Sequence, residues 1–106
     1  MELGPSDYIK VMPERFLADK AGDMRAVIVF DLSGEDGGTW TVRIGGGHCS
    51  VARGADPAAD STIVMSTEDF VGVCTGRVRA MVAFLSGRIR IRGDINKVMR
   101  LRGTFK

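Results

Sequence analysis

Few side chains in this sequence could act together as a catalytic or metal-binding group. The chain contains one histidine, His48, one tyrosine, Tyr8, and two cysteines, Cys49 and Cys74. A histidine beside a cysteine can generate a thiolate nucleophile, but His48 and Cys49 are neighbours on an expected strand, where successive side chains point to opposite faces. One histidine and two separated cysteines also lack the closely spaced ligand pairs of a zinc site. We therefore expect a protein that is not an enzyme and that holds no metal or cofactor.

Three consecutive glycines, Gly45, Gly46 and Gly47, raise the separate question of an anion-binding loop. Such loops lead into the N-terminus of a helix, whereas strand-forming residues follow here. The glycine spacing matches neither the dinucleotide-binding fingerprint nor the P-loop. No G-x-S-x-G nucleophile accompanies the glycine–histidine sequence. A hairpin turn is the better interpretation of these glycines.

Length and composition indicate one globular domain spanning residues 1–106. The chain is 44% hydrophobic and 26% charged, which is typical of a soluble folded protein. Its longest apolar run, residues 80–85, is far shorter than the ~20 residues that cross a bilayer. The first residues lack the pattern of a secretory signal, and two cysteines are too few for a disulfide scaffold. The expected location is the cytoplasm.

The first element that the sequence predicts is an amphipathic helix over residues 5–21. Tyr8, Val11, Met12 and Phe16 recur at the spacing of one helical face. Pro13 lies inside this pattern, where a proline loses a hydrogen bond and clashes with the preceding turn. We expect a kink or two shorter helices at that point.

Four strands are expected next, followed by two helices, a strand and a last helix. Within residues 39–44, Trp40, Val42 and Ile44 face one side, and the residues between them face the other. Ser66 is an expected N-cap of the first of the two helices, and Asp94 of the last helix. Because the links between the first four strands are short, we expect an antiparallel meander. The strands are expected at residues 25–32, 39–44, 48–53, 61–65 and 88–92, and the later helices at 67–75, 78–85 and from 95 onward. This order predicts an α+β fold, a five-stranded, mainly antiparallel sheet covered on one face by helices.

An ordered set of short motifs over residues 26–101 resembles the sterol carrier protein (SCP-2-like, non-specific lipid-transfer) family. The motifs are Gly54, the sequence ADSTI at residues 59–63, STEDF at 66–70, Gly76, Phe84 and GRIRIRGD at 87–94. The resemblance implies a hydrophobic tunnel between sheet and helices that binds a fatty acyl chain, acyl-CoA, sterol or isoprenoid, and transfer of that ligand is a further implication. It equally allows a non-catalytic accessory domain that serves a lipid- or quinone-handling enzyme.

The apolar side chains expected to line such a tunnel converge on the inner faces of the predicted helices, with one on a strand. Methionine suits this role because it is unbranched and adapts to poorly defined apolar ligands, and Met12, Met65, Met81 and Met99 are expected to face the core. The alternative is that these side chains simply fill the core. The expected ligand-binding residues are Phe16, Trp40, Phe70, Met81, Phe84, Leu85, Met99 and Phe105.

Charge is unevenly distributed along the chain. Residues 1–76 carry 6 basic and 12 acidic side chains, whereas residues 77–106 carry 9 basic and 1 acidic. Arg88, Arg90 and Arg92 share one face of an expected strand. These arginines could bind an anionic membrane or the phosphates of acyl-CoA, or form a solvated face. Nucleic acid is not an expected partner, because no aromatic side chains lie between the arginines to stack on bases.

Overall fold

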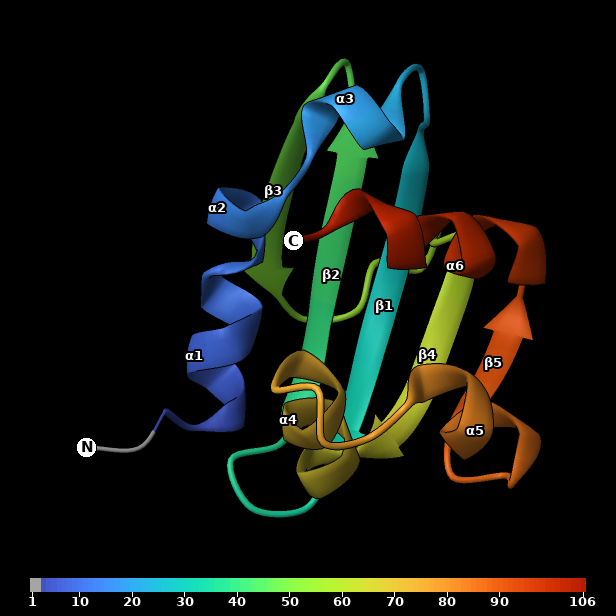
Figure 1. Ribbon diagram of the computed structural model, residues 1–106. Helices are drawn as coiled ribbons and strands as arrows, with labels where there is room; N and C mark the ends of the chain where they lie inside the picture. The colour runs from blue at the N-terminus through green and yellow to red at the C-terminus, as the bar shows by residue number, and fades with distance from the viewer. Residues whose placement is uncertain (1–2) are drawn as a thin grey trace.

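The computed structural model describes residues 3–106 and shows one layer of helices on one face of a five-stranded sheet (Figure 1). The predicted α+β class and mainly antiparallel sheet are confirmed. No helix in the described part of the chain is long and apolar enough to cross a membrane. The strands are β1 (Ala26–Ser33), β2 (Gly38–Gly45), β3 (His48–Arg53), β4 (Ser61–Ser66) and β5 (Arg90–Gly93). The helices are α1 (Pro5–Lys10), α2 (Met12–Arg15), α3 (Ala18–Ala21), α4 (Thr67–Cys74), α5 (Ala80–Leu85) and α6 (Ile95–Leu101), followed by the 3₁₀ turn η1 (Arg102–Thr104).

The sheet is not the antiparallel meander that the short links suggested. Its order is β3-β2-β1-β4-β5, and β4 pairs in parallel with β1 instead of antiparallel with β3. The loop after β3 returns across the sheet and is fixed to β1 at Asp60. The main-chain N–H of Asp60 donates to the Val27 carbonyl at 2.8 Å, and the Asp60 carboxylate accepts from the Val27 N–H at 2.7 Å. These two bonds place β4 beside β1, which link length alone could not predict.

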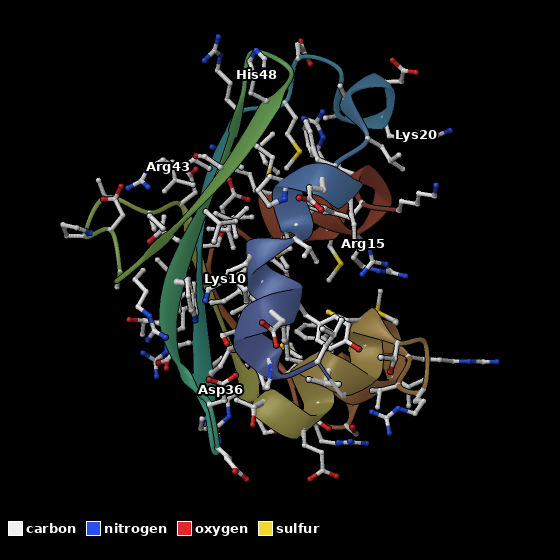
Figure 2. The ribbon with its side chains drawn as sticks, turned by 90° about the vertical axis from the view of Figure 1, so that its left-hand side faces the viewer. Lys10, Arg15, Lys20, Asp36, Arg43 and His48 are labelled. Atoms are coloured by element: carbon white, nitrogen blue, oxygen red, sulfur yellow. The ribbon has the colours of Figure 1, made fainter. Side chains whose placement is uncertain are left out.

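The same loop buries part of the sheet face that carries no helices. Thr41 points to this face, opposite Trp40, yet it is only 2% exposed. Its hydroxyl donates to the Gly54 carbonyl at 2.7 Å and accepts from the Asp56 N–H at 3.1 Å. Arg43 forms an ion pair with Asp56 at 2.8 Å on the same side. The loop therefore closes over the outer side of β2, as Figure 2 shows on the side away from the helices.

Pro13 breaks the N-terminal segment as predicted, and the segment forms three short helices. Pro13 occupies the first turn of α2, a position where the missing N–H costs nothing. α2 ends at Arg15, and the main chain of the next residue, Phe16, is extended. Phe16 then forms an isolated antiparallel bridge with Phe105. The extended residue after α2 therefore connects the N-terminal segment to the C-terminal segment.

Both predicted N-caps are confirmed. The Ser66 hydroxyl accepts from the Asp69 N–H at 3.0 Å, and the Asp94 carboxylate accepts from the N–H groups of Asn96 and Lys97. The Asp69 side chain is itself buried, and Arg88 donates to both of its oxygens. This ion pair ties the start of α4 to the turn that precedes β5.

Replacing Asp69 with asparagine is expected to lower the free energy of unfolding by about 2 kcal/mol, because Arg88 loses a bidentate, largely buried charged acceptor. For a domain of this size the melting temperature should fall by roughly 8–16 °C. Glu68→Gln, in the same helical turn but exposed, is the matched control. Thermal unfolding at pH 7 measures both variants. Equal melting temperatures for the two would contradict the assignment of this ion pair as stabilising.

Candidate functional site

A cavity of about 370 Å³ lies between the sheet and the helices. The sheet contributes Phe30 from β1, Ile63 and Met65 from β4, and Ile91 from β5. Side chains alternate along a strand, so these residues all point toward the helical face. The Phe30 ring lies edge-on to Phe70 of α4, with centroids 5.7 Å apart. The cavity wall is thus continuous from the sheet to the helices.

The helices and the C-terminal segment supply most of the predicted residues. Five of the eight expected ligand-binding residues line the cavity: Phe70, Met81, Phe84, Met99 and Phe105. The four methionines expected to face the core, Met12, Met65, Met81 and Met99, also line it. These side chains, which the sequence predicted to face the core, therefore share one apolar surface.

Phe16, Trp40 and Leu85 do not line the cavity, for three separate reasons. Phe16 follows the break at α2 and packs on Phe105, with ring centroids 5.7 Å apart. Trp40 is buried elsewhere in the core, and the Arg53 guanidinium lies 4.4 Å from its ring centroid. Leu85 is the last residue of the short helix α5 and is 77% exposed. These three residues therefore lie outside the lining of the cavity, and their part in ligand binding stays a prediction.

The predicted ligand-binding residues left out several residues of the cavity lining, among them two groups of particular interest. The strand residues Phe30, Ile63 and Ile91 carry a signal, since they alternate with residues of the opposite sheet face. The second group consists of cations: Arg15, Arg102 and Lys106 also line the cavity. No spacing pattern connects residue 15 with residues 102 and 106, so only the folded chain brings them together.

The thiols and the histidine are not arranged for nucleophilic chemistry. Cys74 lines the cavity, and burial raises the pKa of its thiol to about 11, although the nearby Arg15 charge opposes this shift. Burial likewise raises the pKa of Cys49 to about 11. Both thiols are therefore protonated at neutral pH, and the thiolate is the reactive form. His48 is exposed at the β2–β3 hairpin (Figure 2), and Cys49 packs against the core.

The three arginines predicted to share one strand face, Arg88, Arg90 and Arg92, do not lie in the same surroundings. Arg90 and Arg92 are exposed and flank Ile91, which lines the cavity, so they face the other side of the sheet. Arg88 lies before β5 and is bound to Asp69. The three arginines therefore do not form one free surface.

Comparison with known proteins identifies solved structures with a similar fold and a protein family whose model matches this sequence. The model of the SCP-2 sterol transfer family matches residues 10–106. Hydroxysteroid dehydrogenase-like protein 2 of Bos taurus is 39% identical over 97 residues, which cover 90% of this chain but only 23% of that protein. The chain thus spans about a quarter of the length of this curated relative.

Two solved structures show the fold at different chain lengths. The solution structure of palmitated SCP2L2 from Aedes aegypti has a TM-score of 0.76 at 18% identity, covering 92% of this chain and 86% of that one. The sec-alkylsulfatase Pisa1 from Pseudomonas sp. has a TM-score of 0.84 at 19% identity, covering 98% of this chain and 16% of that one. The fold therefore occurs both in a chain of similar size and within a much longer enzyme. With its family model matched over nearly the whole length, the chain belongs to the SCP-2 sterol transfer family, a family of lipid-binding domains.

Proposed function

We propose that this domain binds a hydrophobic lipid in the cavity between sheet and helices and passes it to an acceptor. The candidate ligand classes are a fatty acyl chain, acyl-CoA, a sterol or an isoprenoid. The single observation that supports the proposal is the apolar cavity itself. Its volume of about 370 Å³ is within the range of small-molecule sites, roughly 300–1,000 Å³.

The cavity is partly open to solvent, and its inner apolar part is larger than the voids that packed protein interiors usually leave. Protein interiors contain few voids larger than one water molecule, which occupies about 30 Å³ in the liquid. Atoms that line an apolar void lose dispersion contacts, and an apolar ligand restores them. Met12, Met65, Met81 and Met99 can adjust their rotamers around ligands of different shape.

Displacement of a neutral fluorescent reporter, N-phenyl-1-naphthylamine, from delipidated protein tests this function. We expect saturable binding of the reporter and competition by at least one of the four ligand classes. Native mass spectrometry of protein purified from its host shows independently which lipid accompanies it. Absence of saturable binding for every class would overturn the proposal.

A second candidate function is a non-catalytic accessory role for a partner enzyme that handles lipids or quinones. In the Bos taurus relative and in the sulfatase, the region that matches this chain is a small part of a much longer chain. This arrangement favours an accessory role. Co-purification with a lipid-handling enzyme, together with an unchanged rate of lipid transfer between vesicles, would favour this role over free transfer. A cytoplasmic site of action stays a prediction.

The predicted membrane contact through Arg88, Arg90 and Arg92 is reduced to two of these three arginines. Arg88 is paired with Asp69, whereas Arg90 and Arg92 are exposed and face away from the cavity. We expect salt-sensitive binding to vesicles containing phosphatidylserine, with a loss of roughly 1 kcal/mol for each arginine removed. Vesicle flotation measures the binding of the Arg90→Gln/Arg92→Gln double variant, with Arg43→Gln as the control. Vesicle binding that is equal in both variants would contradict a role for this face.

A further inference from the structure

A second cavity, of about 430 Å³, lies on the face of the sheet that carries no helices. Val27 of β1, Arg43 of β2 and Ser50 of β3 line it and form one row across the sheet, since Arg43 pairs with both of the others. Side chains alternate along a strand, so this row shares the face of Thr41. Figure 2 shows Arg43 on the side of the sheet away from the helices. No described residue lines both cavities, so this site is separate from the proposed lipid site.

Gly45 allows an arginine side chain to lie across the sheet at this second cavity. Arg25 immediately precedes β1 and, by alternation, points to the same face as Val27. A Cβ added to Gly45 would lie 3.2 Å from a terminal guanidinium nitrogen of Arg25, so the missing side chain leaves room for this group. Gly45 pairs with His48 of β3, which also lines the cavity. Arg25, His48 and Ser50 therefore come together from the two sides of β2.

The second cavity has an excess of positive charge. Arg25, Arg43 and Lys97 line it beside one carboxylate among the described residues, that of Asp60. Both oxygens of this carboxylate already have partners, a main-chain N–H of β1 at 2.7 Å and the Lys97 ammonium at 3.0 Å. Arg43 is held by Asp56, which lies outside the lining. The ion pairs between described residues leave Arg25 out, so its guanidinium lines the cavity without a carboxylate partner.

We propose that this second cavity binds a phosphate monoester or a diphosphate, held by Arg25, His48 and Ser50. A guanidinium presents its N–H groups as a fork that matches phosphate oxygens. The imidazole and the hydroxyl each add a hydrogen-bond donor. The inference is independent of the proposed lipid binding, because the sheet separates this site from the cavity under the helices.

The surroundings of the site favour a phosphate over a singly charged anion. Three cations against one carboxylate leave an excess of two positive charges, which a dianionic phosphate matches. Charges of one sign in a cleft with apolar walls focus their field on the ligand. Half-buried Val27 and buried Ile44 supply such a wall. The volume of about 430 Å³ is within the range of small-molecule sites, so the cavity also holds part of the group that bears the phosphate.

Isothermal titration calorimetry with inorganic pyrophosphate at pH 7 tests the site. We expect saturable binding, and Arg25→Gln should weaken it about tenfold or more, as expected for the loss of one charged hydrogen bond. Arg25 is exposed, so the melting temperature of this variant should stay unchanged. Arg92→Gln is the matched control, because Arg92 is exposed on the same face of the sheet and does not line the cavity. Equal affinity in the two variants, or no saturable binding to the unaltered protein, would overturn the proposal.

Vesicles show whether the phosphate is carried by a lipid head group or by a soluble compound. Phosphatidic acid presents a phosphate monoester, whereas phosphatidylserine presents a diester. Tighter binding to phosphatidic acid vesicles that is lost in Arg25→Gln would assign the site to a lipid head group. Pyrophosphate binding without this preference would assign it to a soluble compound. Binding of acetate as tight as that of pyrophosphate would contradict the selection of phosphate.

Discussion

Replacement of Met99 by tryptophan is expected to weaken lipid binding by at least about thirtyfold, which corresponds to a loss of roughly 2 kcal/mol. Met99 lies on α6 and lines the cavity between the helices and the sheet. The indole ring is larger than the methionine side chain, so it occupies space that the lipid tail would use. Reporter displacement measures the loss for whichever lipid binds the unaltered protein.

The fold should survive this change, because the new side chain fills a void instead of displacing packed atoms. We therefore expect a melting temperature equal to or above that of the unaltered protein. Ile95→Trp is the matched control, on the same helix at an exposed position outside the cavity. Undiminished lipid binding by Met99→Trp would show that the ligand lies elsewhere.

Replacement of Gly93 by alanine is expected to lower the free energy of unfolding by about 4 kcal/mol, from backbone strain and a steric clash acting together. Gly93 ends β5 with a φ of +91°, a left-handed conformation that favours glycine. A Cβ at this position would lie 2.4 Å from the Asp60 carbonyl oxygen. The Asp94 N–H donates to that same oxygen at 3.0 Å, so relieving the clash breaks a bond that positions α6.

Denaturant unfolding measures the effect. Gly103→Ala is the matched control, since Gly103 has no positive φ and its added Cβ meets no atom within 4 Å. The control should change stability by less than about 1 kcal/mol, the size of a glycine–alanine propensity difference. A similarly small change for Gly93→Ala would contradict the steric account.

The helix and strand assignments depended on short-range patterns, and most agree with the structure. Ser66 and Asp94 cap their helices because a side-chain oxygen next to a helix start meets the free N–H groups of the first turn. β2 faces the core with Trp40, Val42 and Ile44, as its alternation predicts. These features arise within a few residues of chain, so local sequence is sufficient to specify them.

Local patterns give an incomplete account where distant segments meet. Thr41 points to the face opposite the core, as its alternation predicts, but the sequence did not indicate that the loop after β3 buries it there. Phe16 fits a helical face by spacing, but α2 ends just before it, and its extended main chain forms a bridge with Phe105 instead. Leu85 fits the α5 pattern, yet the helix ends there and exposes it. Each outcome depends on where a turn directs the chain, which hydrophobic periodicity does not encode.

The sequence by itself determined the α+β order of elements and the apolar helix faces that include Phe70, Phe84 and Met99. The tertiary structure decided that β4 lies parallel to β1 and that side chains from these faces line a cavity between the helices and the sheet. It also placed Arg15 beside Lys106 across nearly the whole length of the chain. The physical reason is the range of the interactions. Caps and periodicity act between near neighbours, whereas a cavity and its charged end exist only once the two chain ends pack together on the sheet.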